Sequence, residues 1–381
     1  MLDCVYCLKN KFDVGKGSLE HVILSSLGGR KGSRNICCGP CNNRLGNSID
    51  EPFADEFSFF STMLGITTGR NKPAPTHKRF LYHDGRAYDI GPNGRFTLSK
   101  REVEVGKPDE SGKKKISITT ATPEQARFQV EQILNSLGKS EDDLQTFQAQ
   151  LTTAYIPAVE ERISLGGHIQ LRCVAKMLLT YAATLISPER LRDGTFQKMI
   201  SYINETNSNF EEIGLDQQTI FPATPQLDPI NHRVFFTASK RNKLAIGLLE
   251  IYGQVRYSAV LSREWTGPSI SKGYAINPVT QEHIELNLKL GDDVFCLHGE
   301  RCFDLAKLMC SLGELIKTFQ ERQTHQQISE IIAAALEKHI VGKGEIMTEQ
   351  MLNAFISEVA TKYAKFHLRI DSVEDIDLKS S

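Results

Sequence analysis

Two pairs of cysteines near the start of the chain constrain its fold more than any other feature. Cys4 and Cys7 form the first pair and Cys38 and Cys41 the second, with two residues between the members of each pair. Two such knuckles supply the four thiolates of a tetrahedral structural zinc site. One ion then holds together a segment that is too short to build its own core. The sequence therefore predicts structural Zn²⁺ on these four thiolates, with Cys37 as a buried neighbour outside the site.

The segment between the two pairs carries polar residues that a structural zinc site does not require. Glu20 and His21 are adjacent, and a glycine-rich loop follows at residues 25–33. Asn35 comes next, and Asn42 directly follows the last cysteine of the second pair. A histidine beside a carboxylate, with amide side chains close by, indicates chemistry beyond that of a structural metal site.

The order of these residues resembles that of the zinc-containing HNH endonucleases. The resemblance covers residues 3–53 and rests on four segments: Leu19-Glu20-His21-Val22-Ile23, Leu27-Gly28-Gly29, Asn35-Ile36 and Cys38-Gly39-Pro40-Cys41-Asn42-Asn43-Arg44-Leu45-Gly46-Asn47. Two positions depart from the common pattern. The family usually has Asp-His where this chain has Glu20-His21, and it often has histidine at the position of Asn42. Asparagine is a familiar variant there, so the departure bears on the choice of metal more than on activity.

The resemblance implies a ββα-metal module in which a catalytic ion lies beside the structural zinc. Glu20 and Asn42 would bind this divalent ion, Mg²⁺ or Mn²⁺, and His21 would be the general base that activates water. Asn35 is the second catalytic residue that it implies, supporting the loop and orienting His21. Because Glu20 and His21 are neighbours in a strand, a twist or bulge must turn the His21 ring. The phosphates of DNA would be bound by four cations, Arg30, Lys31, Arg34 and Arg44.

The chain is long enough for more than one domain. Its 381 residues suggest two or three domains. We expect an α+β protein, in which the HNH nuclease module spans residues 1–57 and a basic linker with β-hairpins spans 58–121. A mixed α/β region with several helices, at residues 122–381, would serve regulation, target recognition or oligomerisation. The net charge of −1 argues against a uniformly basic surface but leaves room for a local basic face.

The sequence carries no pattern that indicates a membrane or an export route. It has no run of 18 apolar residues, and its first residues lack the charged and apolar regions of an export signal. Cysteines clustered as metal ligands are typical of a reducing compartment. We therefore expect a cytoplasmic protein without membrane contact.

Several local patterns predict individual elements. Residues 167–186 read as a buried helix, strands are expected within 232–261, and residues 303–366 read as helical with breaks near 323–324 and 342–344. Residues 100–115 are expected to be solvated, and the tail 371–381 to be frayed. Four further residues do not match a zinc spacing and are expected to be structural, with Cys310 on an apolar helix face: Cys296, His298, Cys302 and Cys310.

Together these patterns indicate a metal-dependent DNA endonuclease. A small nuclease without restraint would cut host DNA, so the larger region is expected to select the target, restrain the nuclease or build a homo-oligomer, in restriction or phage defence. Two alternatives stay open. One is a catalytically silent zinc module that binds nucleic acid or protein. The other is a nuclease effector gated by a small-molecule activator that binds in the C-terminal region.

Overall fold

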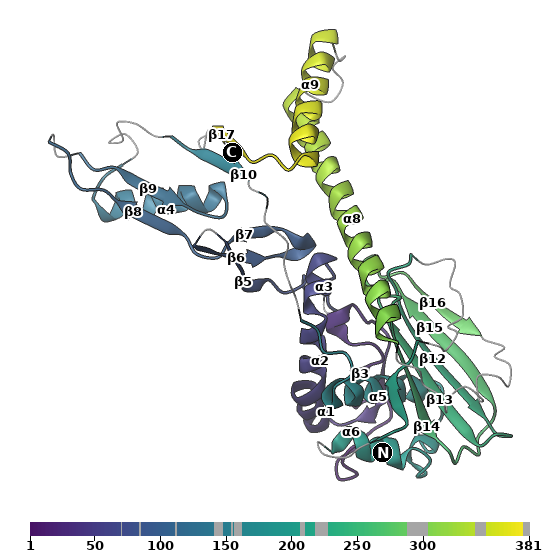
Figure 1. Cartoon of the computed structure of the whole chain (residues 1–381). Coiled ribbons are helices and arrows are strands. Elements are labelled where there is room, and N and C mark those ends of the chain that lie inside the picture. The colour runs from purple at the N-terminus through teal and green to yellow at the C-terminus, as the bar shows by residue number, and fades with distance from the viewer. Residues whose placement is uncertain are drawn as a thin grey trace. The chain divides into compact units, whose positions relative to one another are not determined.

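The chain is organised into two compact units, each assembled from two separated segments. The computed structural model describes residues 1–69, 71–83, 85–110, 113–140, 148–153, 155, 162–205, 210–217, 228–287, 304–339 and 348–375. The first unit joins residues 1–75 to 162–319, and the second joins 76–161 to 320–381. The expected partition at residues 57 and 121 was linear, whereas each unit brings together segments that are far apart in the chain. Figure 1 shows the elements with their labels.

The N-terminal segment of the first unit contains two short hairpins followed by helices. The first hairpin pairs β1 (Leu2–Asp3) with β2 (Lys11–Phe12), and the second pairs β3 (Ser18–His21) with β4 (Gly32–Cys37). The 3₁₀ turn η1 (Ser25–Leu27) lies between β3 and β4. Helix α1 (Gly39–Leu45) begins directly after β4, because an extended Cys38 and a proline in the first helical turn favour a helix start. The π-helical turn η2 (Gly46–Asp50), α2 (Glu51–Glu56) and α3 (Ser58–Met63) follow.

A six-stranded antiparallel sheet forms much of the rest of the first unit. Its strand order is β11-β14-β13-β12-β15-β16. The strands are β11 (Ile213–Leu215), β12 (His232–Ser239), β13 (Leu244–Ile251), β14 (Val255–Ser262), β15 (Ile270–Ile276) and β16 (His283–Asn287). The strands predicted within residues 232–261 are thereby confirmed. Gly253, at a φ of 70°, makes the turn between β13 and β14.

Helix α5 (His168–Ala183) is the central helix of the first unit and confirms the buried helix predicted at residues 167–186. It contacts β3, β4, η2 and α2 of the N-terminal segment, and also β12, β13 and β14 of the sheet. All residues from Arg172 to Ala183 are buried. The turn η5 (Arg190–Arg192) and helix α6 (Gln197–Asn204), which packs against α5, follow it. A charged side chain on this part of α5 is therefore removed from water and needs a compensating partner inside the protein.

The second unit contains smaller sheets and several helices. A three-stranded antiparallel sheet is formed by β5 (His77–His83), β6 (Arg86–Ile90) and β7 (Phe96–Leu98), with the turn η3 (Pro92–Gly94) before β7. Two further antiparallel pairs are β8 (Glu102–Val105) with β9 (Ile116–Thr119), and β10 (Gln150–Thr153) with β17 (Ser372–Asp375). The helices are α4 (Pro123–Ser136), the part of α8 (Leu305–His339) that follows Phe319, and α9 (Glu349–His367).

Residues 100–115 are solvated as expected: the described ones are exposed except for the half-buried Glu102, although 102–105 form β8 in register with β9. Three other local expectations were wrong. Strand β17 orders part of the expected frayed tail by pairing with β10. Helix α8 runs without a break through Thr324, whose hydroxyl donates to the Gln320 carbonyl at 2.8 Å and so fits the helix. Cys310, expected on an apolar helix face, is exposed on α8.

The class of the fold agrees with the expectation. Helices and antiparallel sheets occur together in both units, as in an α+β protein. Within the described part of the chain, the helices lack the combination of length and apolar character needed to cross a bilayer. The predicted break near residues 342–344 and the residues Cys296, His298 and Cys302 lie outside the described residues.

Candidate functional site

Four sulfur atoms meet near the N-terminus. The Sγ atoms of Cys4, Cys7, Cys38 and Cys41 all lie within 4.8 Å of one another, and those of Cys7 and Cys38 are 3.9 Å apart. Thiolates around a tetrahedral Zn²⁺, with Zn–S bonds of about 2.3 Å, lie about 3.8 Å apart. The cluster therefore fits the structural zinc that the sequence predicts. Cys37 lies outside it, since its buried thiol contacts Glu20 instead.

Hydrogen-bond donors surround this cluster. The Cys38 N–H donates to Cys4 Sγ at 3.4 Å, and Asn10 Nδ2 donates to Cys38 Sγ at 3.3 Å. Burial raises the pKa of the Cys7 thiol, but the backbone N–H groups of Asn10 and Lys9 outweigh this effect and the pKa falls to about 6. Such bonds stabilise the thiolate, which is the form that binds metal. Burial raises the pKa of the Cys4 and Cys41 thiols. The fit to Zn²⁺ therefore rests on the spacing of the four sulfur atoms, and the ion would join the first hairpin to the start of α1.

The hairpin of β3 and β4 carries the adjacent carboxylate and histidine. Glu20 pairs with Ser33 and His21 with Gly32, and the register shifts between Ser18 and Glu20. An irregularity of the kind predicted is therefore present, but it precedes Glu20. Glu20 is buried, with 2% of its surface exposed, whereas His21 is half-buried. Because neighbouring side chains of a strand point to opposite faces, Glu20 faces the interior and His21 the other face of the hairpin.

Helix α5 binds the Glu20 carboxylate from inside the unit. The Lys176 ammonium contacts Glu20 Oε1 and lies 2.6 Å from Asp50 Oδ2. Cys37 Sγ donates to Glu20 Oε2 at 3.5 Å, so both oxygens of this carboxylate have partners. Cys173, one turn before Lys176 on α5, donates from its thiol to Asp50 Oδ1 at 3.5 Å. These five residues form a polar cluster between the hairpin, η2 and α5.

Burial and charge together set the ionisation of this cluster. Burial alone would lower the pKa of the Lys176 ammonium, but Asp50 and Glu20 outweigh it and raise that pKa. Burial raises the pKa of Glu20, while Lys176 acts in the opposite direction. Burial, together with the Glu20 charge, also raises the pKa of the Cys37 thiol. Lys176 is therefore held as a cation between two carboxyl groups, beside a neutral thiol.

The two predicted amide side chains lie in different surroundings. The Asn42 N–H closes the first turn of α1 by donating to the Cys38 carbonyl at 3.0 Å. Its Oδ1 lies 4.0 Å from Cys37 Sγ, the thiol that also contacts Glu20. Asn35 Oδ1 accepts from the Gly15 N–H at 2.7 Å, which ties β4 to the loop before β3. Glu20 and Asn42 therefore both lie near the Cys37 thiol. The contact of Asn35 with His21 stays a prediction.

Three of the four cations predicted to bind phosphate make short contacts within the protein. These contacts are Arg30 to the Thr68 carbonyl (2.9 Å), Lys31 to Glu285 (2.5 Å) and Arg44 to Asn204 (2.6 Å). Arg34 is exposed, and its guanidinium donates to the Gly17 carbonyl over a longer distance of 3.3 Å. A phosphate would compete least with internal contacts at Arg34.

A buried histidine of the sheet anchors the glycine-rich loop. His232 Nε2 lies 2.9 Å from the Leu27 carbonyl oxygen, and Nδ1 accepts from the Tyr252 N–H at 3.1 Å. Nε2 must therefore carry the proton of a neutral ring. Burial lowers the pKa of His232 to about 4, although the Leu27 carbonyl acts in the opposite direction. The loop after Glu20 and His21 is thereby fixed to β12.

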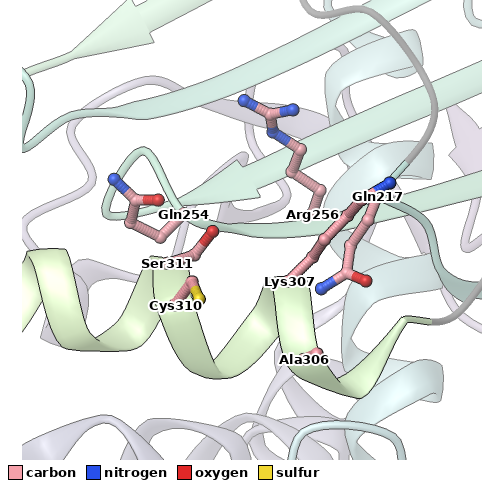
Figure 2. A pocket seen from close by; sticks show the side chains of 7 residues that line it. All are labelled: Gln217, Gln254, Arg256, Ala306, Lys307, Cys310 and Ser311. Atoms are coloured by element: carbon pink, nitrogen blue, oxygen red, sulfur yellow. The ribbon is translucent and has the colours of Figure 1, made fainter.

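A separate hollow of about 440 Å³ lies between the sheet and the start of α8 (Figure 2). Its lining residues are Gln217, Gln254, Arg256, Ala306, Lys307, Cys310 and Ser311. Arg256 donates to Glu250 Oε2 at 2.6 Å, and Lys307 Nζ lies 3.8 Å from an Asp304 oxygen. Both cations already have carboxylate partners, so the hollow does not by itself indicate an anionic ligand.

Sequence reasoning missed Lys176 and Asp50. A signal for Lys176 existed, because it lies in the apolar helix predicted to be buried, and lysine is almost never fully buried without a partner. The pattern could not name the partner, since Glu20 is 156 residues away in the chain. Asp50 follows the second knuckle closely, but nothing in its spacing indicates a role.

The catalytic ion implied by the resemblance does not fit the present arrangement of Glu20. An ion shared by Glu20 and Asn42 needs an open carboxylate oxygen. Here Oε1 contacts a lysine and Oε2 a thiol, and the Glu20 side chain is only 3% exposed. The four clustered cysteines fit a zinc ion, whereas the Glu20 carboxylate is already bound by the Lys176 ammonium.

Comparison with known proteins agrees with the zinc geometry. The family model of the HNH endonucleases matches residues 4–58, from the first zinc cysteine to the start of α3. No curated protein and no solved structure matches the chain. The matched segment contains the four clustered thiols, the hairpin with Glu20 and His21, and α1 with Asn42. Residues 4–58 of this chain therefore match the HNH endonuclease family, and the four-thiol cluster within them is consistent with a zinc-binding HNH module.

Proposed function

We propose that this protein is a metal-dependent DNA endonuclease that hydrolyses phosphodiester bonds at its HNH module. The observation that carries the proposal is the family match over residues 4–58, which coincides with a four-thiol cluster of zinc geometry. A structural zinc alone would not require Glu20 and His21 at the end of β3, nor Asn42 in the first turn of α1. Their presence in family order favours catalysis over a purely structural role.

His21 is the residue that we assign to the general base. A half-buried imidazole can accept a proton from water near neutral pH. Asn35 would act as a positioning residue through the loop that it ties to β4. Glu20 and Asn42 are the oxygen donors that we propose for a divalent ion, Mg²⁺ or Mn²⁺. Glu20 could hold this ion only after release from Lys176, which contacts it in this structure. Support for this pair is their shared contact with Cys37.

DNA is the substrate that we propose, because the module offers cations beside the glycine-rich loop. Arg34 and Arg44 are the exposed members of this set, whereas Arg30 and Lys31 are half-buried. Phosphate contacts of this kind supply most of the sequence-independent affinity for nucleic acid. Because an unrestrained nuclease would damage host DNA, we propose a cytoplasmic role in restriction or antiviral defence, in which the remainder of the chain controls the module.

The decisive experiment is plasmid cleavage by the zinc-loaded protein in Mg²⁺, Mn²⁺ or Ni²⁺. The variant His21→Ala should lose about 10²- to 10⁴-fold in cleavage rate, the usual effect of removing a general base. It should keep its zinc content and its far-ultraviolet circular dichroism. The matched control is His283→Ala, which removes an exposed histidine whose Nδ1 lies 3.4 Å from the Gln281 carbonyl and whose ring lies against Tyr274.

The alternative makes a different prediction in the same assay. A catalytically silent zinc module would bind DNA or protein but would not cut DNA with any of these ions. Absence of cleavage by the wild-type protein on plain and modified DNA would therefore remove the nuclease proposal. If cleavage began only after addition of a nucleotide or another small molecule, the effector version of the nuclease would account for it.

A further inference from the structure

The cation beside Glu20 in this structure is a lysine of helix α5. Lys176 is 1% exposed, contacts Glu20 Oε1, and lies 2.6 Å from Asp50 Oδ2. An ammonium has three donors, and two of them are directed at these carboxylates. A buried lysine of this kind is stable only when its charge is compensated, which Glu20 and Asp50 achieve together.

We infer that Lys176 occupies the place of a divalent ion at Glu20, so that metal can bind there only when the ammonium is displaced. The inference rests on the proposed function, because it takes Glu20 as the ligand of the catalytic ion. It adds a means of control: the module and its inhibitor belong to one chain, and α5 carries the inhibitor. Removal of the ammonium raises the affinity of the site for metal.

The geometry makes competition unavoidable. Glu20 has two carboxylate oxygens, and Lys176 and Cys37 contact one each. A dication bound to either oxygen would lie within a few ångströms of the ammonium, where like charges repel strongly inside a protein. Asn42 Oδ1, the second assigned ligand, lies 4.0 Å from Cys37 Sγ, the thiol that donates to Glu20 Oε2. The ammonium is therefore the group that must leave Glu20 before a dication can bind there.

The position of α5 explains why the ammonium stays in place. The helix contacts β3 and β4 of the nuclease hairpin as well as strands β12, β13 and β14. The backbone of Lys176 is therefore packed on both sides, and Glu20 is freed by a rotation of either side chain or by a shift of α5. Asp50, with its side chain 21% exposed, offers the ammonium a partner nearer the surface.

The test measures Mn²⁺ binding to the zinc-loaded full chain by electron paramagnetic resonance. Lys176→Met removes the charge and keeps the length of the side chain, and Lys176→Gln keeps hydrogen-bond donors for both carboxylates. Each should bind Mn²⁺ at least about tenfold more tightly than the wild type, since a neighbouring positive charge is lost. Adding Glu20→Gln to either variant should abolish the gain. The matched control, Arg233→Gln, removes a buried cation from the Glu250 pair in the sheet and should leave Mn²⁺ binding unchanged.

Thermal unfolding gives a second measurement. Without Mn²⁺, both Lys176 variants should unfold at a lower midpoint temperature than the wild type. Addition of Mn²⁺ should raise the midpoint of each Lys176 variant by more than it raises the midpoint of Arg233→Gln. Equal or weaker Mn²⁺ binding by both variants would overturn the inference. So would variants that stay unfolded even with Mn²⁺, because the ammonium would then be a structural group that metal cannot replace.

Plasmid cleavage measured on the same samples separates the two proposals. A gain in Mn²⁺ affinity without cleavage by any of the proteins would leave the inference standing and remove the nuclease. Cleavage by the wild type, with no gain in affinity in either Lys176 variant, would leave the nuclease standing and remove the inference.

Discussion

His232 Nε2 lies 2.9 Å from the carbonyl oxygen of Leu27, 205 residues earlier in the chain. This bond joins strand β12 of the sheet to η1, the turn that follows the strand with Glu20 and His21. The other ring nitrogen accepts from the Tyr252 N–H, so the buried ring is neutral and its tautomer is fixed. A residue outside the family-matched segment thus positions the loop beside the candidate nuclease site.

The first prediction concerns the pH dependence of this contact. The pKa of His232 is about 4 in the folded protein, against 6.5 for an unperturbed histidine. The unfolded state therefore binds the proton first as the pH falls. The neutral His232 ring therefore contributes about 3 kcal/mol to the free energy of unfolding above pH 6.5. This contribution is lost as the pH falls from 6.5 to about 4. Urea unfolding across this pH range should show that the free energy of unfolding falls less in His232→Gln than in the wild type.

The control for this measurement is His283→Gln, which changes an exposed histidine of β16. The free energy of unfolding of this variant should change with pH as it does in the wild type. Equal acid sensitivity in His232→Gln and the wild type would contradict a neutral, buried His232.

The second prediction concerns the zinc ligands. Cys38→Ser removes one of four thiolates, so the protein should lose its zinc, and the segment before α2 should become sensitive to protease. Cys37→Ser is the matched control, because it changes the adjacent residue, whose thiol contacts Glu20 rather than the zinc cluster. This variant should retain one zinc per chain, measured by elemental analysis. Zinc retained by Cys38→Ser but lost by Cys37→Ser would show that the ligand set is wrong.

Local sequence patterns predicted the zinc cluster and most elements around it. The spacing of Cys4, Cys7, Cys38 and Cys41 constrains one ion directly, and the start of α1 follows from residues of the second knuckle, with a proline in the first helical turn. Apolar residues on several faces likewise predicted the buried helix at 167–186, and runs with strand character predicted the strands within 232–261. These features depend on residues that are close in sequence, so a single chain is sufficient to find them.

The contacts between distant segments could not be predicted in the same way. The periodicity of α5 indicates that Lys176 is buried, but it does not say that Glu20 and Asp50 are its partners. His232 carried no spacing signal, although it contacts Leu27. Both contacts depend on how residues 162–319 pack against residues 1–75, which is a property of the tertiary fold. For the same reason, sequence reasoning assigned Glu20 to an open metal site.

The third prediction concerns the glycine-rich loop. A Cβ atom at Gly29 would lie 1.8 Å from the Ile23 carbonyl oxygen, so the backbone would have to move. Gly29→Ala should therefore cost at least about 2 kcal/mol of unfolding free energy, in the upper range of overpacking substitutions. Gly46→Ala is the control, because a Cβ there meets nothing within 4 Å and its backbone is helical. Equal unfolding midpoints for the two variants would show that the loop does not pass close to Ile23.

The fourth prediction separates DNA contacts from structural contacts among the cations of the module. Arg34 is exposed, so Arg34→Ala should weaken binding of duplex DNA and reduce the slope of log affinity against log salt by about 1, without changing the unfolding midpoint. Arg30 is half-buried and donates to the Thr68 carbonyl at 2.9 Å. Arg30→Ala should therefore lower the unfolding free energy by about 1 kcal/mol, the usual size of a lost hydrogen bond. Fluorescence anisotropy in a salt series and urea unfolding measure the two effects, and an unchanged salt slope in Arg34→Ala would remove Arg34 from the DNA-binding surface.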